Sequence, residues 1–506
     1  MIRPKSKVER TLGELMDYFG LTTEDKSLVE IRISGITSDS RAIEPGDLFI
    51  ALPGEVSHGC EFLRSAMERG ARAVLTDQHG DEVASRISNA FPRLVVPKPR
   101  SICGPVASWF YGEPSRSMYV AGITGTNGKT TTTFLLEQIW KFAELKSGLI
   151  GTVGIQFDNR HFPATHTTPE SDITQAILAT MKEAGTRAVA MEVSSHALVQ
   201  ERVKGIRFSA VGFTNLTQDH LDFHGTMDKY FQAKSLLFTD EYADLAIVSI
   251  DGDYGKKIWN QIQIKKIAVS SDFPRSGTRS PEATWYFERL IETPEGFDLL
   301  IRGSSGISIE NEFRMIGRFN LENLLIAVAI AFESGVDPLV IAEALPHLKG
   351  APGRLERVPT KKLIALVDYA HTPDAVERAL SAVSQQTSKR VIAVLGCGGD
   401  RDSSKRPLMG RALHEGADIP IFTSDNPRSE DPQRIISQMI EGINLKSGAE
   451  VIVDRRAAIQ RAVEVAESGD VILVLGKGHE TGQEVNGVKT PFNDSAELLS
   501  AIEAKP

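Results

Sequence analysis

Short runs of apolar residues alternate with longer segments of helical periodicity along most of this 506-residue chain. A strand of a parallel sheet is apolar on both faces because helices cover both, whereas the helix that follows it is apolar on one face only. The alternation therefore predicts an α/β protein with mainly parallel sheets. The clearest predicted strands are 47–52, 73–75, 119–120, 188–193, 210–214, 246–250, 364–367, 391–395, 419–423 and 471–475, and the clearest helices are 61–69, 134–140, 228–234 and 321–334.

Two interruptions of this pattern divide the chain. Pro97-Lys98-Pro99 and Gly350-Ala351-Pro352-Gly353 are typical of linkers, because proline and glycine end both helices and strands. Three domains also fit the length of the chain. The predicted domains are 1–98, 99–350 and 351–506. Residues 265–318 are turn-rich and strand-like, which predicts an antiparallel addition to the central sheet, and the third domain has the alternation of a Rossmann-like dinucleotide fold.

The composition limits the possible classes of protein. Lysine and arginine number 57 against 66 aspartate and glutamate, and the net charge of -9 argues against a general nucleic-acid or membrane-surface binder. Cys60, Cys103 and Cys397 lie far apart without metal-type spacing, so we expect neither disulfides nor a zinc site. No apolar stretch has the length of a signal-peptide core or a membrane span. We therefore expect a cytoplasmic monomer without membrane insertion.

The strongest chemical signal is the segment Ala121-Gly-Ile-Thr-Gly-Thr-Asn-Gly-Lys-Thr-Thr-Thr-Thr133, between a predicted strand and a predicted helix. Glycines allow backbone N–H groups to close around phosphate oxygens, Lys129 supplies a positive charge for the β- and γ-phosphates, and Thr130 offers a hydroxyl to Mg²⁺. The segment departs from full Walker spacing because Ile123 stands six residues before the lysine. A simple Gly/Thr-rich turn is the alternative. The predicted phosphate-binding residues are Gly125, Thr126, Asn127, Gly128, Lys129, Thr130 and Thr131.

Three further polar segments lie at or after predicted strands of the same domain: 192–196, 214–222 and 228–234. The carboxyl ends of parallel strands meet at one edge of a sheet, which is where ligands bind. Each segment alone can serve a structural role. Together with Lys129, the three segments make a nucleotide site at this edge of the sheet more specific.

Together with the segments Gly317-Arg-Phe-Asn-Leu-Glu-Asn323 and Val367-Asp-Tyr-Ala-His-Thr-Pro-Asp-Ala375, this set resembles the Mur ligases, the ATP-dependent amide-forming enzymes of peptidoglycan precursor assembly. The resemblance covers essentially the whole chain. It implies an N-terminal α/β domain that binds a UDP-muramoyl substrate, a central P-loop ATPase domain, and a C-terminal Rossmann-like domain that binds an amino acid. Within the family, the chain is most similar to the branch that adds the third residue of the peptide.

The resemblance also implies substrates, cofactors and site residues. The implied reaction joins meso-2,6-diaminopimelate to the D-glutamyl γ-carboxylate of UDP-N-acetylmuramoyl-L-alanyl-D-glutamate with ATP and Mg²⁺. The implied contacts of the UDP-muramoyl-peptide are Ser38, Ser40, Ser57, His58, Thr167, Thr168, Ser194, Gln200 and Arg202. The implied contacts of ATP beyond the phosphate loop are Asn323, Arg354, Asp368 and His371. The implied catalytic residues are Lys129, Glu192, His220 and Lys234. The implied metal ligands are Thr130, Glu192, His220 and Lys234, the last as N6-carboxylysine, a carbamate.

The acceptor amino acid is indicated by residues 424–431, Ser-Asp-Asn-Pro-Arg-Ser-Glu-Asp. The Asp-Asn-Pro-Arg part is similar to the signature of Mur ligases that select meso-diaminopimelate. That substrate carries a carboxylate and an ammonium at its distal carbon, where lysine carries only an ammonium, so Arg428 would pair with the carboxylate and Glu480 with the ammonium. An Asn-Pro turn with a solvated arginine is the alternative. The implied acceptor residues are Arg401, Asp425, Asn426, Pro427, Arg428, Gly476 and Glu480.

The inferred mechanism starts from a carboxylate, which is a poor electrophile until ATP converts it to an acyl phosphate that an amine can attack. Both reacting groups of the first step are anions, so Lys129 alone is insufficient as a countercharge. An ammonium cannot ligate a cation, whereas a carbamate can, and an unmodified surface or phosphate-facing Lys234 stays the alternative. Three other functions stay open: the same ligation with L-lysine, a folylpolyglutamate synthase-like ligase, and a nucleotide-switch module without ligation.

Overall fold

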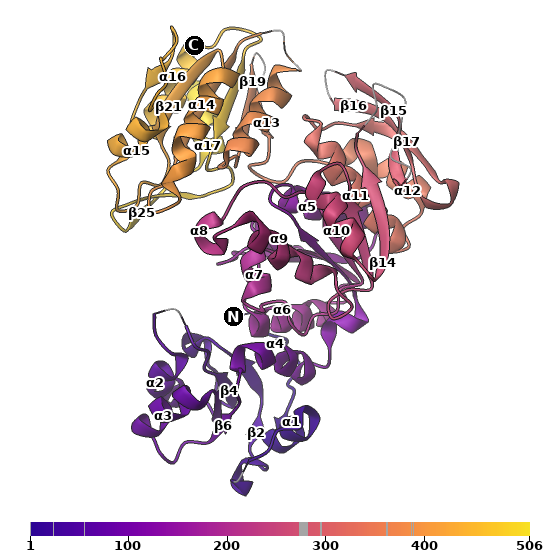
Figure 1. The fold of residues 1–506 in the computed structure, drawn as a ribbon, viewed down its shortest axis with the longest axis vertical. Helices are drawn as coiled ribbons and strands as arrows, with labels where there is room; N and C mark the ends of the chain where they lie inside the picture. The colour runs from indigo at the N-terminus through magenta and orange to yellow at the C-terminus, as the bar shows by residue number, and fades with distance from the viewer. Residues whose placement is uncertain are drawn as a thin grey trace.

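The first domain lies at the lower end of the computed structural model, the central domain lies above it, and the third domain lies beside the upper part of the central domain (Figure 1). The structure describes residues 2–23, 25–54, 56–272, 282–293, 296–360, 363–385, 387 and 389–505. Helices surround sheets that are mainly parallel, which confirms the predicted α/β class. Within these ranges, no helix combines the length and the apolar character needed to cross a bilayer.

A parallel sheet in the order β3-β4-β5-β6 forms the first domain. The elements are β1 (Arg10–Thr11), α1 (Leu12–Phe19), β2 (Arg32–Ile33), β3 (Gly35–Thr37), β4 (Asp47–Ile50), α2 (Leu63–Glu68), β5 (Ala73–Thr76), α3 (Gln78–Ile87), β6 (Arg93–Val95) and α4 (Pro99–Phe110). Cys103, Val106 and Phe110 of α4 lie in the same buried core as Leu48 and Ile50 of β4. We therefore propose that the first domain extends through α4, beyond residue 98.

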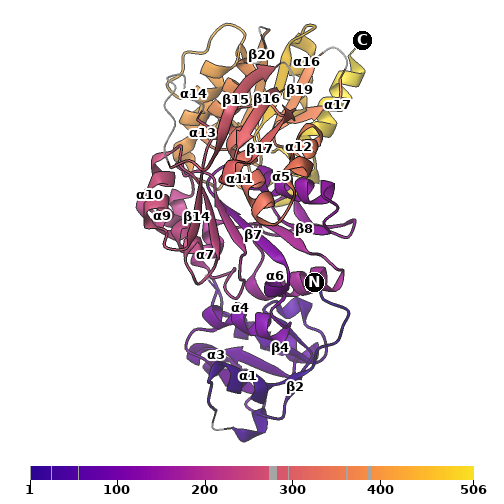
Figure 2. The same ribbon diagram turned by 90° about the vertical axis from the view of Figure 1, so that its right-hand side faces the viewer.

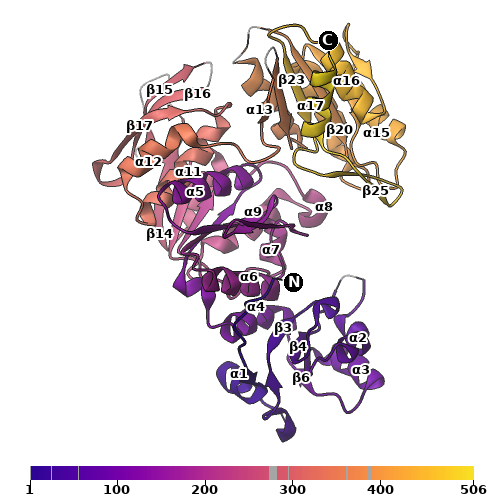
Figure 3. The ribbon, with the colours of Figure 1, turned by 180° about the vertical axis from the view of Figure 1, so that it is seen from behind.

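The central domain is built on a sheet whose described strands have the order β10-β9-β8-β11-β7-β12-β13-β14-β15-β16-β17. Its elements are β7 (Tyr119–Thr124), α5 (Lys129–Phe142), β8 (Ser147–Gly151), β9 (Gly154–Phe157), β10 (Arg160–Phe162), α6 (Ser171–Glu183), β11 (Ala188–Glu192), α7 (Ser195–Val199), β12 (Ala210–Phe213), α8 (Leu221–His224), α9 (Met227–Ser235), β13 (Leu245–Ser249), α10 (Asp253–Gln261), β14 (Lys265–Ser270), β15 (Trp285–Thr293), β16 (Gly296–Arg302), β17 (Ser308–Phe313), α11 (Phe319–Glu333) and α12 (Pro338–Ala344). Helices α5, α11 and α12 pack together on one face (Figure 3), and α6, α9 and α10 pack on the other.

The antiparallel addition predicted for residues 265–318 is present as β15, β16 and β17, which lie side by side in Figure 2. Strand β14 still pairs in parallel with β13, so the change of direction comes after residue 270. Residues 273–281 and 294–295 of the predicted segment lie outside the described residues.

The third domain has a sheet in the order β18-β19-β23-β20-β21-β22, in which β18 is antiparallel to its neighbour. Its elements are β18 (Glu356–Val358), β19 (Ile364–Asp368), α13 (Pro373–Ser384), β20 (Val391–Cys397), α14 (Arg406–Gly416), β21 (Ile419–Ser424), α15 (Pro432–Met439), β22 (Glu450–Val451), α16 (Arg455–Val465), β23 (Val471–Leu475), β24 (Gly482–Val485), β25 (Val488–Pro491) and α17 (Asp494–Ala504). The chain leaves β20 toward β21 but leaves β23 toward α17, which packs beside β19. Opposite connections of neighbouring parallel strands place a ligand crevice at their carboxyl ends.

Candidate functional site

The phosphate loop joins β7 to α5 at the carboxyl edge of the central sheet. The Lys129 ammonium donates hydrogen bonds to the carbonyl oxygens of Gly125 and Thr126, each over 2.9 Å. Gly128 has a φ of 88°, and a Cβ atom there would lie 2.2 Å from the Asn323 side-chain oxygen. Only glycine adopts this conformation freely and fits without a shift of the Asn323 side chain, and the bare backbone can approach an anion closely.

Glu192 ends β11, the strand beside β7, and is fully buried. Its carboxylate accepts hydrogen bonds from the Thr130 hydroxyl at 2.9 Å and from the Thr152 backbone N–H and hydroxyl at 2.8 and 3.1 Å. These donors hold the carboxylate at the start of α5. Two of the predicted metal ligands, Thr130 and Glu192, are therefore in direct contact.

Lys234 lies on α9 and is only 1% exposed, so the surface-lysine alternative is wrong. Its Nζ donates to the Gly125 carbonyl at 2.8 Å, the same oxygen that accepts from Lys129. The Tyr230 ring lies 4.7 Å from this nitrogen. Burial and the neighbouring Lys129 charge lower the pKa of Lys234 well below its usual value. A lowered pKa makes the neutral amine, the form that reacts with CO₂, easier to reach, so the environment suits a carbamate.

His220 follows β12 with a left-handed φ of 52°, and its Nε2 lies 3.3 Å from the Asp219 carboxylate. The His196 ring is 4.9 Å away. Partial desolvation lowers the pKa of His220 to about 4; the Asp219 carboxylate opposes this shift, whereas His196, Lys129 and Lys234 add to it. The neutral imidazole can act as a ligand. Asp219 was not among the residues predicted from the sequence, although its place directly before His220 was an available signal.

The donor set is compatible with Mg²⁺ held partly by substrate. Among the described residues, no group of three or more His, Cys, Asp and Glu side chains forms a metal cage. Protein sites for Mg²⁺ commonly use one or two carboxylates and complete the shell with phosphate oxygens and water. The Glu192 carboxylate and the Thr130 hydroxyl offer such oxygens, and a carbamate on Lys234 would offer more.

The third domain contributes Arg354, Asp368 and His371. Arg354 Nη2 donates to the Thr130 hydroxyl at 3.4 Å, and its guanidinium lies 4.8 Å from the centre of the Tyr369 ring. The Asp368 carboxylate accepts two backbone N–H bonds of 2.7 Å. His371 Nδ1 lies 2.9 Å from the Tyr369 carbonyl, and burial lowers the pKa of His371 to about 4. Arg354 thereby joins the third domain to the start of α5.

Predicted ATP contacts from separate segments line one small cavity of about 60 Å³. The lining includes Asn127, Gly128, Thr131, Asn323, Arg354 and Asp368. Glu322, which was not predicted, also lines it and accepts hydrogen bonds from Ser249 and Asn215. Burial raises the pKa of Glu322 to about 7. Its burial depends on the packing of α11 against β12 and β13, which no local sequence signal reports.

Several predicted muramoyl-peptide contacts lie beside Glu192. The Thr168 hydroxyl donates to the Glu192 carbonyl at 2.9 Å and accepts from the Ser194 N–H at 3.1 Å. Arg202 donates to the Thr168 carbonyl at 3.3 Å. The Thr167 hydroxyl lies 3.1 Å from the Thr152 hydroxyl, which donates to the Glu192 carboxylate. These side chains therefore surround the end of β11 that carries Glu192.

A cleft of about 1180 Å³ separates the first domain from α6 and the β9-β10 hairpin. Ser38, Ser40 and Ser57 line it. The Ser38 backbone N–H and hydroxyl donate to the fully buried Asp172 carboxylate of α6 at 2.7 and 2.9 Å. Ser38 thus contributes to the contact between the two domains as well as to the cleft wall.

Two of the predicted muramoyl-peptide contacts, His58 and Gln200, have hydrogen-bond or ion-pair partners within the protein. His58 Nδ1 accepts the Cys60 N–H at 3.1 Å, and its Nε2 lies 3.2 Å from the Asp77 carboxylate. The Gln200 carbonyl, at the end of α7, accepts from Arg100 at 3.5 Å. The roles of His58 and Gln200 in substrate binding stay predictions.

The predicted acceptor residues gather at the carboxyl ends of β20, β21 and β23. Arg428 Nη1 donates to the Gly399 carbonyl at 2.6 Å, and its Nε lies 3.7 Å from the Glu484 carboxylate. A Cβ atom on Gly398 would lie 3.1 Å from Arg428 Nη1 and 3.9 Å from Arg401 Cγ. The two arginines therefore flank Gly398 on adjacent loops.

Lys477 was not among the predicted residues, although it stands between Gly476 and Glu480. It is fully buried, and its Nζ donates to Glu480 at 2.8 Å and to the Asn426 side-chain oxygen at 3.0 Å, and lies 3.9 Å from Asp425. Asn426 also donates to Glu480 at 2.8 Å. Burial raises the pKa of Asp425, and Lys477 opposes this rise. Lys477 thus unites three predicted acceptor residues in one network.

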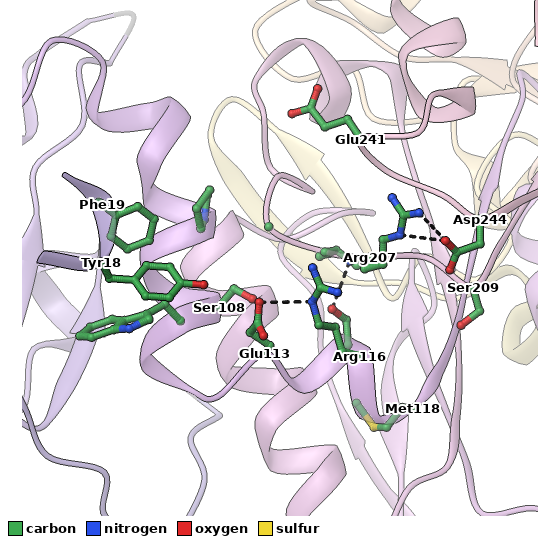
Figure 4. A pocket seen from close by; sticks show the side chains of 15 residues that line it. Tyr18, Phe19, Ser108, Glu113, Arg116, Met118, Arg207, Ser209, Glu241 and Asp244 are labelled. Carbon is green, nitrogen blue, oxygen red and sulfur yellow. Dashed lines mark hydrogen bonds and ion pairs between the residues drawn. The ribbon is translucent and has the colours of Figure 1, made fainter. Parts of the chain in front are cut away.

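Another pocket, of about 730 Å³, lies at the junction of the first and central domains (Figure 4). Met118, Ser209 and Asp244 place it at the amino ends of the central strands, opposite the phosphate loop. Both of its arginines have acidic partners: Arg207 pairs with Asp244, and Arg116 pairs with Glu113 over 3.2 Å. Because ligands of parallel sheets bind at the carboxyl ends, this pocket is a poor candidate for the active site.

Family models match most of the chain. They are "Mur ligase family, catalytic domain" at residues 32–104, "Mur ligase middle domain" at residues 123–331, and "Mur ligase, glutamate ligase domain" at residues 353–478. Their order and spacing follow the three domains of the structure.

Individual relatives match over nearly their whole length. The UDP-N-acetylmuramoyl-L-alanyl-D-glutamate--2,6-diaminopimelate ligase of Streptomyces coelicolor is 42% identical, over 99% of this chain and 98% of that protein. The ligase of the same name from Gloeobacter violaceus is 41% identical over 98% of each chain. A solved structure of a ligase of this name matches with a TM-score of 0.69 at 32% identity, over 97% of this chain and 98% of that one. The matches agree with the phosphate-loop geometry, and the chain belongs to the Mur ligase family.

Proposed function

We propose that this protein is an ATP-dependent ligase of peptidoglycan precursor synthesis that joins meso-2,6-diaminopimelate to UDP-N-acetylmuramoyl-L-alanyl-D-glutamate. The observation that carries the proposal is the link that Arg354 makes between the phosphate loop and the acceptor segment. Its guanidinium donates to the Thr130 hydroxyl and lies over the Tyr369 ring, which is 5.3 Å from the His479 ring of the acceptor segment. An amine bound in the third domain would thus approach the place where the γ-phosphate is transferred.

The first chemical step brings two anions together, the D-glutamyl carboxylate and the γ-phosphate. At 4 Å two unit charges repel by about 4 kcal/mol at an effective dielectric constant of 20. Lys129 and Arg354 both lie at the start of α5 and supply positive charge there. When bound, Mg²⁺ would neutralise further phosphate charge, and Thr130, Glu192, His220 and carbamylated Lys234 would hold it.

The acceptor site is proposed to recognise the distal carbon of diaminopimelate by its two charges. Arg401 and Arg428 would pair with the carboxylate, since a guanidinium fork matches a carboxylate. Glu480, oriented by Lys477 and Asn426, would pair with the ammonium. Lysine would leave the arginines without a partner, which disfavours the lysine alternative.

The cleft between the first and central domains is the proposed site of the UDP-muramoyl part of the substrate. We also propose that the protein is a cytoplasmic monomer.

The family model "Mur ligase family, catalytic domain" covers residues 32–104, within this UDP-type domain, and the relatives match nearly the full chain. Both findings disfavour the folylpolyglutamate synthase-like alternative.

The decisive experiment is phosphate release from ATP in the presence of the UDP-dipeptide, with diaminopimelate, lysine or glutamate as the acceptor. Rapid release is expected only with diaminopimelate. Release with lysine or glutamate instead would transfer the assignment to those ligases. ATP binding without amine-dependent release would favour the nucleotide-switch alternative.

Replacing Arg428 with alanine is expected to lower kcat/KM for diaminopimelate by about 100-fold, because loss of a desolvated charge pair costs about 3 kcal/mol. The KM values for ATP and the UDP-dipeptide should change little. Lysine should gain relative to diaminopimelate. The measurement is kcat/KM for both amino acids on both proteins, with Arg456→Ala as a control, since Arg456 pairs with Glu497 between α16 and α17. An unchanged ratio of the two amino acids would remove Arg428 from substrate recognition.

A further inference from the structure

Arg406, at the start of α14, is 1% exposed and has several hydrogen-bond partners. Its guanidinium grips the Glu430 carboxylate as a fork, with bonds of 2.9 and 2.7 Å. Nη1 also donates to the Gln438 side chain at 2.6 Å, and Nη2 donates to the Gly398 carbonyl at 3.1 Å. A buried charge persists only where such partners compensate its desolvation, so this arrangement depends on the whole network.

The groups that Arg406 binds belong to the two loops that carry the acceptor arginines. Gly398 lies in the loop after β20, which contains Arg401, and Glu430 lies in the loop after β21, which contains Arg428. We call these segments, 398–401 and 426–430, the acceptor loops. The Arg406 side chain thus connects the two acceptor loops, because it binds the Glu430 carboxylate of one and the Gly398 carbonyl of the other.

The acceptor loops are also bonded directly to each other. The Asp400 N–H donates to Glu430 at 2.6 Å, and the Ser429 N–H and hydroxyl donate to Asp400 at 3.1 and 2.7 Å. The Gly399 N–H donates to the Asn426 carbonyl at 2.9 Å. A Cβ atom on Gly399 would lie 1.9 Å from the Pro427 carbonyl, so the loops touch without space for a side chain.

The backbone next to both arginines is in an uncommon conformation. Asp400, which precedes Arg401, and Arg428 itself each have a φ of 52°. Residues other than glycine adopt this left-handed region at a cost and keep it when surrounding contacts over-determine it. Glu430 supplies such a contact for Asp400, and Arg406 holds Glu430 in place.

We propose that Arg406 is a positioning residue for acceptor selection: its fork on Glu430 and its bond to Gly398 set the separation at which Arg401 and Arg428 grip one distal carboxylate. The inference rests on the proposed diaminopimelate-ligase function. Arg406 lies behind the loops and acts through them. A fork cannot be replaced by a single ammonium, so the arrangement specifies arginine rather than positive charge alone.

The test compares Arg406→Lys, Glu430→Gln and the double variant with wild type in the full-length protein. Arg406→Lys is expected to raise the diaminopimelate KM at least about 10-fold, to leave the KM values for ATP and the UDP-dipeptide within about 2-fold, and to lower selectivity for diaminopimelate over lysine. Glu430→Gln should act in the same direction. Because both changes break one fork, their effects in the double variant should fall well short of additivity.

Arg390→Lys is the matched control. Arg390 donates two bonds to Asp470, of 3.1 and 2.6 Å, at the opposite, amino-terminal end of the same sheet. This variant should change stability without changing the selectivity for the acceptor. Melting temperatures of all variants are measured alongside the kinetics.

An unchanged ratio of diaminopimelate to lysine in folded Arg406→Lys, or an equal loss for all three substrates, would overturn the positioning role. If Arg406→Lys does not fold, Glu430→Gln decides by the same two criteria. A wild type that is inactive with diaminopimelate would instead refute the proposed function, so the two failures are distinguishable.

Discussion

Lys129→Ala should lower ATP-dependent phosphate release by about 10³-fold, the upper end of the range for loss of one preorganised charge stabiliser. The ammonium is bonded to the Gly125 and Thr126 carbonyls and meets its full anionic partner only when nucleotide is bound. Burial also lowers the pKa of Lys129, which means that the folded protein without nucleotide bears a cost for desolvating this amine. Removing the side chain removes that cost together with the two hydrogen bonds. The free energy of unfolding should therefore change little, as checked by chemical denaturation.

Lys141→Ala is the control for Lys129→Ala. It removes a lysine from the last turn of the same helix, where the side chain is half exposed and pairs with Glu137. This variant should keep wild-type turnover. A folded Lys129→Ala protein with wild-type activity would contradict the assignment of the phosphate site.

Lys234→Ala is expected to reduce turnover by about 10³-fold, because it would remove an anionic metal ligand once the lysine is carbamylated. Lys234→Glu should recover part of this loss, since a carboxylate imitates the charge of a carbamate but not its reach. Removing CO₂ and bicarbonate should slow the wild-type enzyme, and the Lys234→Glu variant should be insensitive to that treatment. The measurements are turnover with and without bicarbonate and the carbamate signal in the ¹³C spectrum after labelling.

Lys229→Ala provides the comparison, because Lys229 lies on the same helix, α9, but is exposed. It should behave as wild type in both conditions. Wild-type turnover in Lys234→Ala, or equal CO₂ dependence in Lys234→Glu and wild type, would remove the proposed role of the carbamate.

The sequence alone determined the fold class and the segments that form the site. Strands such as β23, and β11 up to Glu192, are buried at every position and therefore appear in the sequence as apolar runs. The phosphate loop and the polar segments after the central strands could be located because parallel strands bring their carboxyl ends to one edge. Helix α4 is different: Pro97 and Pro99 are typical of a linker, yet Pro99 begins the helix, and the apolar face of the helix packs on the first domain.

The tertiary structure decided which side chains are buried and which of them share a partner. The surface and buried alternatives for Lys234 were separated by the packing of α9, which brings its amine to the same carbonyl as Lys129. Lys477 and Arg406 were invisible to local patterns, because a charged residue in a short polar segment normally lies in solvent. Their hydrogen-bond partners lie up to 51 residues away for Lys477 and 32 for Arg406. Hydrophobic periodicity reports which face of an element is apolar, whereas compensation of a buried charge requires groups that only the folded chain brings together.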